Sequence, residues 1–386
     1  MTPTKLAVDE EALVACVACG LCLPHCPTYR VTGDETASPR GRIAAMRAAH
    51  TGVVGLRGEF TEYMDLCVQC RACEAVCPSS VPFGQLMEGT RETLAIETRF
   101  VPWWQRAAYR VLPRHRLLVA LSRVGAVLQR VRLVPRRLGL PKLALRAPRL
   151  QATGSDVWLF TGCVMDAWSR DVHAAVIRVL GAAEVGVALP DARGAGCCGA
   201  LHGHAGLESD ARSLALRVMR AFPGDAPILV DSAGCGAMLK DYGHLVGAPE
   251  AGAFAARVLD VHEFLAAHLD RLPTPTRRFE EPVALHDACH LRHVQKAHGA
   301  VRTVLAPFAE VRELDDEGLC CGAGGAYAAL HPDMAAQIRA RKIDAIARAG
   351  TSVVASANPG CTFHLAAAGL DVRHPFEIID DVLTSS

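Results

Sequence analysis

Apolar residues follow two different spacings from residue 154 to the end of the chain. Four short runs are almost wholly apolar: DVWLF (156–160), APILVD (226–231), PVALHD (282–287) and TSVVAS (351–356). In the longer segments between them, apolar residues recur every three or four positions: RDVHAAVIRVLGAA (170–183), LESDARSLALRVMRAF (207–222) and DMAAQIRARKIDAIARAG (333–350). Short apolar runs are typical of strands buried on both faces, and the longer spacing is typical of helices. Strands alternating with helices predict α/β domains with parallel sheets.

The cysteines of this region occur in two copies of one pattern. The first copy comprises Cys163, Cys197, Cys198 and Cys235, and the second Cys289, Cys320, Cys321 and Cys361. Corresponding cysteines are 126, 123 and 126 positions apart, which indicates an internal duplication. The single cysteines each follow a predicted strand end, where parallel α/β sheets bind their ligands. We therefore expect one cysteine site in each copy.

Adjacent cysteines lie between glycines in GAGCCGA (194–200) and GLCCGAGGAY (318–327). Neighbouring side chains diverge from a regular strand or helix, whereas glycine permits a tight turn that brings both thiols to one place. A buried structural cysteine pair is the alternative interpretation. The companion cysteines at strand ends favour a metal or redox site.

Two further cysteine runs lie in the first 98 residues. One comprises Cys16, Cys19, Cys22 and Cys26 before Pro27, and the other Cys67, Cys70, Cys73 and Cys77 before Pro78. This is the C-x2-C-x2-C-x3-C-P spacing of two-cluster ferredoxins, in which the fourth cysteine of each run ligates the other cluster. We therefore expect two [4Fe-4S] clusters with crossed ligation: Cys16, Cys19, Cys22 and Cys77 for the first, and Cys26, Cys67, Cys70 and Cys73 for the second. Structural zinc and disulfides are the alternatives, but zinc sites normally close with two cysteine pairs around one ion.

Composition narrows the class of protein. The chain has 386 residues, 51% hydrophobic content and a formal net charge of +1, which indicate a folded protein and argue against nucleic acid as a partner. The N-terminus contains acidic residues and no apolar core of a signal peptide, so we expect a cytoplasmic location. Sixteen cysteines in that reducing compartment point to metal or redox chemistry.

Four regions follow from these patterns: an α-helical ferredoxin-type domain (1–98), a basic connector (99–153), and two cysteine-rich domains (154–275 and 276–386). Residues 101 to 150 contain eleven arginines, one lysine and no acidic residue. VPWWQRAAYRVL (101–112) and LLVALSRVGAVLQRVRL (117–133) predict amphipathic helices, interrupted by Pro113, Pro135, Pro141 and Pro148. Such a segment can lie peripherally on an anionic membrane, clamp an acidic partner subunit, or wrap the acidic domains of its own chain.

The motifs together resemble a known family. They are ACVACGLCLPHCPTYRVTGDETASPRGRI (15–43), DLCVQCRACEAVCPS (65–79), AGCCGALH (195–202), SAGCGAMLKDYG (232–243), HDACHLRHVQK (286–296), LCCGAGGAYAALHPD (319–333) and ANPGCTFHLAAAGLDVRH (357–374). The repeats resemble the CCG domains of heterodisulfide reductases, lactate-utilisation proteins and the anaerobic glycerol-3-phosphate dehydrogenase. The whole chain resembles the iron-sulfur subunits of bacterial glycolate oxidases. The resemblance implies an α+β multidomain fold, with a helical 2[4Fe-4S] domain before two tandem α/β CCG domains.

One departure from the wider superfamily concerns the last cysteine motif. The heterodisulfide reductase version ends each repeat in C-x2-C, whose fifth cysteine helps to ligate a noncubane cluster, but here that place is taken by Met238 and His364. Each repeat could instead hold a further four-cysteine iron-sulfur cluster, a site completed by His364 in the second copy, or only thiols.

Histidines gather near these motifs: His202, His204, His286, His290, His293 and His364. Imidazole can ligate a metal or carry a proton, although most such histidines only satisfy local hydrogen bonds. We favour His290 and His364 for a functional role. Lys240 and Lys296 can bind an anion or orient a partner, but solvated lysines are the simpler interpretation.

The chain contains no G-x-G-x-x-G segment after a first strand and no recognisable flavin segment. We therefore expect an electron conduit without an identified catalytic residue of its own. The resemblance implies that an FAD subunit oxidises glycolate to glyoxylate while this chain, inactive alone, passes electrons to a quinone or another acceptor. Alternatives are the same role for D-lactate, another 2-hydroxy acid or glycerol-3-phosphate, a thiol-disulfide reductase, and a redox sensor.

Overall fold

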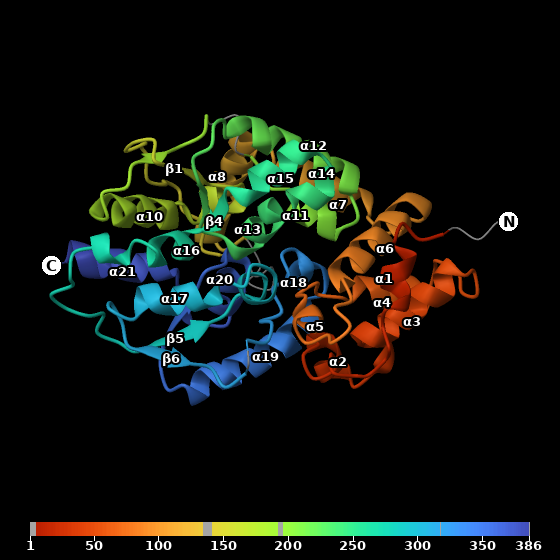
Figure 1. The fold of residues 1–386 in the computed structure, drawn as a ribbon. Coiled ribbons are helices and arrows are strands. Elements are labelled where there is room, and N and C mark those ends of the chain that lie inside the picture. Colours follow the sequence, from red (N-terminus) through yellow and green to blue (C-terminus); the bar gives the residue numbers. More distant parts are fainter. Residues whose placement is uncertain (1–4, 134–140, 192–195, 317, 386) are drawn as a thin grey trace.

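The computed structural model describes residues 5–133, 141–191, 196–316 and 318–385 (Figure 1). Residues 5–98 form helices and turns without a strand, as predicted for a helical ferredoxin-type domain. The elements are α1 (Glu10–Val14), α2 (Pro27–Thr32), η1 (Glu35–Ala37), α3 (Pro39–His50), α4 (Glu59–Asp65), α5 (Ala72–Ala75) and α6 (Phe83–Glu97). Pro27 begins α2 directly after Cys26, which fits its lack of an N–H donor. Met46, Met64 and Met87 are fully buried in the core of this domain.

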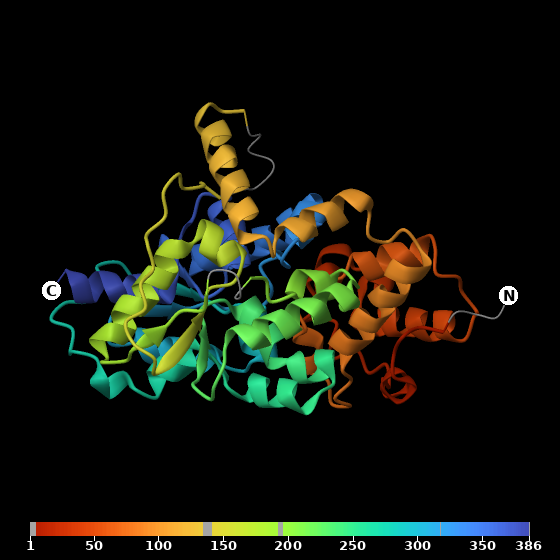
Figure 2. The same cartoon turned by 90° about the horizontal axis from the view of Figure 1, so that it is seen from above.

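The connector contains the two predicted helices, α7 (Trp103–Val111) and α8 (His115–Arg130). Pro135, one of the predicted helix breaks, lies outside the described residues. Figure 2 shows α8 projecting from the body of the molecule. Its inner side packs on the first repeat, where Trp168 Nε1 donates a hydrogen bond to Ser122 Oγ at 2.8 Å. Leu118 is buried against Cys163, so the connector covers the first cysteine site.

Two four-stranded parallel sheets follow. Their strands are β1 (Val157–Phe160), β2 (Val187–Ala188), β3 (Ile228–Val230) and β4 (Val258–Asp260) in the first, and β5 (Val283–His286), β6 (Val311–Glu313), β7 (Val353–Ser356) and β8 (Asp371–Arg373) in the second. The strand orders are β2-β1-β3-β4 and β6-β5-β7-β8. Because the second order repeats the first element for element, the structure confirms the duplication and the parallel α/β architecture.

Helices cover both sheets. In the first repeat they are α9 (Val164–Trp168), α10 (Arg170–Ala182), α11 (Ala200–His204), α12 (Glu208–Ala221), α13 (Ala233–Lys240), α14 (Tyr242–Val246), α15 (Pro249–Ala256), α16 (Val261–Ala266) and η3 (Leu269–Arg271). In the second they are the π-helical turn η4 (His290–Val294), α17 (His298–Leu305), α18 (Tyr327–Leu330), α19 (Pro332–Arg348), α20 (Pro359–Ala366) and α21 (Pro375–Thr384).

The two repeats share one hydrophobic core. The C-terminal helix α21 lies beside α10 of the first repeat (Figure 1), and Leu180 and Ile379 belong to one buried cluster. Arg178 forms a bidentate ion pair with Asp380: its Nε donates to Oδ1 at 2.8 Å and its Nη2 donates to Oδ2 at 2.6 Å. The repeats therefore form one packed unit, which fixes the relative positions of the two cysteine sites.

Candidate metal centres

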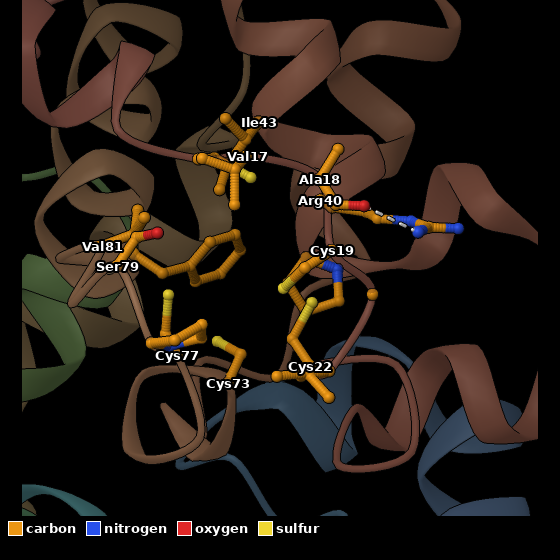
Figure 3. A pocket seen from close by; sticks show the side chains of 16 residues that line it. Val17, Ala18, Cys19, Cys22, Arg40, Ile43, Cys73, Cys77, Ser79 and Val81 are labelled. Atoms are coloured by element: carbon orange, nitrogen blue, oxygen red, sulfur yellow. Dashed lines mark hydrogen bonds between the residues drawn. The ribbon is translucent and has the colours of Figure 1, made fainter.

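The first ferredoxin run and the end of the second line one pocket. Cys16, Cys19, Cys22 and Cys77, the four cysteines predicted for one cluster, all line it, together with Cys73. Figure 3 shows the labelled cysteines directed into the shared space. The remaining lining is largely apolar, with Val17, Ile43, Val81 and Phe83 among its residues. Converging thiols in an apolar setting fit a [4Fe-4S] cluster.

Both ferredoxin runs have the same unusual backbone around their second cysteine. Ala18 and Gly20, which flank Cys19, have φ values of 56° and 85°. Gln69 and Arg71, at the corresponding places of the second run, have φ values of 58° and 60°. Left-handed backbone is uncommon for residues other than glycine and is often found at functional sites. Its recurrence indicates that both runs wrap their thiols around a common kind of centre.

The second cysteine set lies deeper in the protein. Cys26, Cys67 and Cys70 are buried. Burial raises the pKa of the Cys73 thiol well above its usual range, and the neighbouring thiols of Cys70, Cys67 and Cys26 add to this shift. Cys73 therefore lies between the two sets, facing its predicted partners as well as the first pocket. The crossed assignment of individual ligands stays a prediction.

A buried guanidinium group lies beside this second set. Arg42 is 1% exposed, and its Nε and Nη1 donate to the carbonyl oxygens of Tyr63 at 2.8 Å and Ala37 at 2.6 Å. Burial raises the pKa of the Cys26 thiol, and the charge of Arg42 opposes that shift. Among the described residues, Arg42 has no carboxylate partner. A buried cation needs nearby negative charge, which cluster thiolates supply.

A second buried guanidinium group joins the same region to the first repeat. The Nη2 atom of Arg91 donates to the carbonyl oxygens of Met64 at 2.7 Å and Cys67 at 2.8 Å. Its Nη1 donates to the carbonyl oxygen of His204 at 2.8 Å. Arg91 also lacks a carboxylate partner in the described part of the chain. It holds the Cys67 loop in place and places a second positive charge beside the predicted cluster.

The four cysteines of the first repeat converge as predicted. Cys198 Sγ lies 3.4 Å from Cys235 Sγ. A hydrogen bond from the Cys163 thiol, followed by one from Cys198, holds the pKa of Cys197 well below its usual range. Gly199 has φ 92°, which permits the turn directly after the adjacent pair. Gly196 directly precedes the pair, and Gly194, the first residue of this motif, lies outside the described residues.

The second repeat builds the same arrangement. Cys320 interacts with the thiols of Cys289 and Cys321, and Cys321 interacts with Cys361. Gly322, the counterpart of Gly199, has φ 91°. All four cysteines are therefore grouped beyond the strand ends of their sheet. Four converging thiols fit a metal or redox centre better than isolated buried cysteines do.

The second repeat also contacts the ferredoxin-type domain through sulfur. The thiols of Cys320 and Cys70 are neighbours in one buried cluster. Val68 and Tyr327 pack around this contact, and the Tyr327 hydroxyl donates to the carbonyl oxygen of Leu66 at 3.1 Å. The second ferredoxin set and the second repeat site are thus immediate neighbours, an arrangement that sequence spacing could not reveal.

The structure separates the two favoured histidines from each other. His290 Nδ1 lies 3.5 Å from Cys289 Sγ, and burial lowers the pKa of this imidazole to about 3. His364 Nε2 lies 3.3 Å from the carbonyl oxygen of Ala335, which gives it a local hydrogen-bond partner.

Another histidine, to which sequence reasoning gave no special role, faces the second site. A ring nitrogen of His286 and the sulfurs of Cys321 and Cys361 lie within 4.8 Å of one another. The signal available in the sequence was the position of His286 as the last residue of a buried strand. Lys240, by contrast, pairs with Glu263 at 2.6 Å, so its charge is already matched within the fold.

Comparisons with known proteins agree with this architecture. Residues 12–81 match the 4Fe-4S dicluster domain, and residues 157–240 and 283–366 match the cysteine-rich domain. The glycolate oxidase iron-sulfur subunit of Escherichia coli (strain K12) is 33% identical over 404 residues, covering 99% of this chain and 97% of that protein. The probable glycolate oxidase iron-sulfur subunit of Bacillus subtilis (strain 168) is 32% identical, covering 94% and 90%. Lactate utilization protein A of an Exiguobacterium is 25% identical over 58% of this chain and 94% of its own length.

The dicluster domain makes two [4Fe-4S] clusters the cofactors of this chain. The two cysteine-rich domains with parallel sheets confirm the predicted fold class. Near-complete coverage of a relative at this identity establishes more than a shared domain. The chain therefore belongs to the family of glycolate oxidase iron-sulfur subunits, a group of oxidoreductase components.

Proposed function

We propose that this chain is the electron-transfer subunit of a glycolate dehydrogenase complex. A partner subunit with FAD oxidises glycolate to glyoxylate, and this chain passes the electrons to a quinone or another acceptor. The relatives named as glycolate oxidase iron-sulfur subunits support the substrate. The observation that carries the electron-transfer role is the contact between Cys70 and Cys320, because it brings a ferredoxin cysteine group next to a cysteine group of the second repeat.

Bound iron-sulfur clusters supply reversible one-electron transfer. The chain's own residues set the conditions for that chemistry. Cys26, Cys67 and Cys70 are buried, which excludes water from the second ferredoxin site. The guanidinium groups of Arg42 and Arg91 bring positive charge to the same site, and positive charge favours an added electron.

Reconstitution tests this proposal. The anaerobically purified chain is expected to be brown and to show no activity when given glycolate and an artificial acceptor. Addition of the flavoprotein partner should restore glycolate-dependent reduction of the clusters, followed by their visible bleaching. A Cys67→Ser variant should lower this reduction, whereas a substitution of the exposed Val53 should not. Glycolate oxidation by the isolated chain would contradict the proposal.

D-lactate is the second candidate substrate of the complex. The similarity to lactate utilization protein A favours it, although that relative covers only part of this chain. Because the hydroxy acid would bind the flavin subunit, the two candidates differ in which acid reduces the clusters of the reconstituted complex. Faster reduction by D-lactate than by glycolate would favour the second candidate.

The outer side of α8 is the surface that we assign to docking of the partner subunit. Leu121 and Val124 are exposed there, and Arg123 lies next to them in a segment without acidic residues. No helix among the described residues is long and apolar enough to cross a bilayer. We expect Leu121→Gln with Val124→Gln to weaken complex formation. Loss of binding to anionic vesicles instead would assign this surface to a peripheral membrane contact.

A further inference from the structure

We propose that His286 is a nitrogen ligand of the metal centre in the second repeat. The two repeats would then hold chemically different centres: one with sulfur ligands alone, and one with sulfur and imidazole nitrogen. This inference concerns the donor atoms of the chain and does not depend on which hydroxy acid the complex oxidises.

The position of the imidazole is the first support. His286 is the last residue of β5 and is 2% exposed. One of its ring nitrogens lies within 4.8 Å of the sulfurs of both Cys321 and Cys361, and these two sulfurs also lie within 4.8 Å of each other. Ligands of one metal ion, with bonds of about 2.0–2.3 Å, must lie within such a range of each other.

The unmet hydrogen-bonding capacity of the ring is the second support. Although His286 lies beside the Cys321 thiol, neither of its nitrogens has a hydrogen-bond partner of standard geometry in the described part of the chain. Buried polar groups are almost always paired, so an imidazole with two unpaired nitrogens calls for an explanation. A metal bond to one nitrogen provides it.

The duplication supplies an internal comparison. The residue that ends β1, and so corresponds to His286 at the end of β5, is Phe160. Phenylalanine cannot bind a metal, so the first repeat lacks this ligand. His364, at the place of the fifth cysteine of heterodisulfide reductases, already interacts with the Ala335 carbonyl oxygen. The geometry thus favours His286 over the histidine that sequence comparison suggests.

Pulsed electron paramagnetic resonance of the full chain tests this assignment. Metal analysis first establishes whether the second repeat holds iron or zinc, since both accept sulfur and nitrogen ligands. Zinc is then replaced by paramagnetic Co²⁺, whereas an iron centre is examined directly. We expect a ¹⁴N coupling of a directly bound imidazole in the wild-type chain. His286→Cys should remove this coupling while the metal content stays unchanged.

Two further variants complete the experiment. His286→Phe, which copies the first repeat, should lose the metal of the second repeat and keep the iron of the ferredoxin clusters. His364→Gln should retain both the metal and the ¹⁴N coupling. A wild-type second repeat without metal, absence of the coupling, or its persistence in His286→Cys would each overturn the proposal. If His286→Phe fails to fold, His286→Cys still decides the question.

Discussion

The thiol of Cys320 in the second repeat lies next to the thiol of Cys70 in the second ferredoxin run, within one buried cluster. The two residues are 250 positions apart in the chain, and each belongs to a separate cysteine group. Cys197, which corresponds to Cys320 in the first repeat, interacts with Cys163 and Cys198 of its own site, as Cys320 does with Cys289 and Cys321. Both repeats contact the ferredoxin-type domain, but in different ways: the first does so through the His204 carbonyl oxygen and Arg91, whereas the second brings one of its cysteines next to a ferredoxin cysteine.

This asymmetry predicts unequal effects of two matched substitutions. Cys320→Ala removes a sulfur that touches Cys70, so it should shift the reduction potential and the resonance spectrum of one ferredoxin cluster. Cys197→Ala removes the corresponding sulfur of the first repeat and should leave both properties unchanged. Redox titration followed by electron paramagnetic resonance measures the difference. Equal shifts in the two variants would show that the contact has no electronic consequence.

Removal of the buried charge of Arg91 should change the reduction potential of the neighbouring cluster. Its guanidinium group donates to the Cys67 carbonyl oxygen at 2.8 Å, and positive charge stabilises the reduced, more negative cluster. We expect Arg91→Met to lower the potential of that cluster by on the order of 50 mV, as one charge in a protein interior should. Arg91→Lys, which keeps the charge, should shift it less. Iron content identifies any loss of the cluster itself, and equal potentials in all three proteins would contradict the prediction.

The central strands and the converging cysteines could be predicted because both follow from local patterns. The apolar runs became β1, β3, β5 and β7, which are flanked on both sides within their sheets. The edge strands were missed because they are less apolar and partly exposed, as β6 (Val311–Glu313) and β8 (Asp371–Arg373) illustrate. Neither contains the continuous apolar run that marks the central strands.

The contacts between distant segments could not be predicted, because they depend on how the domains pack. Arg91 belongs to no recognisable sequence motif. Its contact with the first repeat depends on the position of the His204 carbonyl oxygen in the folded protein. The approach of His286 to Cys321 likewise depends on the tertiary fold. Cysteine spacing is a local signal of the ferredoxin clusters, whereas a histidine at a strand end has many ordinary roles.

Gly206, in the loop before α12, has no room for a side chain. A Cβ atom at this glycine would lie 2.2 Å from the carbonyl oxygen of Arg91 on α6, and its φ is 75°. Gly206→Ala should therefore disturb the docking of the first repeat on the ferredoxin-type domain and destabilise the protein by about 2–4 kcal/mol. Gly224 has the same φ, but nothing lies within 4 Å of its Cβ position.

Gly224→Ala is thus the matched control for backbone strain alone, which costs about 1–2 kcal/mol. The apparent melting temperature should fall further for Gly206→Ala than for Gly224→Ala. Limited proteolysis should also cut Gly206→Ala faster, since the domain contact opens. Identical behaviour of both variants would show that the close approach to Arg91 is relaxed at little cost.

Two carboxyl groups, those of Glu92 and Glu208, meet where the first repeat packs on the ferredoxin-type domain, and they should make the stability of the protein depend on pH. Burial raises the pKa of Glu92 on α6 to about 7, and a hydrogen bond to Glu208, the first residue of α12, adds to the shift. Glu92 thus keeps its proton in the folded protein at pH values where the unfolded chain, with a pKa near 4.5, has lost it. The contribution of this pair to stability is fully present below pH 4.5 and is lost as the pH rises through about 7.

Glu92→Gln keeps a neutral hydrogen-bond donor at every pH, so its stability relative to wild type should increase from pH 5.5 to pH 8. Because Glu92 is partly exposed, solvent screening limits the gain to about 1 kcal/mol, which corresponds to an increase of about 2 °C in melting temperature. Glu97→Gln on the exposed side of the same helix should not change the pH dependence. Melting curves of wild type, Glu92→Gln and Glu97→Gln at several pH values measure how the stability of each protein depends on pH. A constant difference between Glu92→Gln and wild type across that range would mean that the two carboxyl groups do not share a proton.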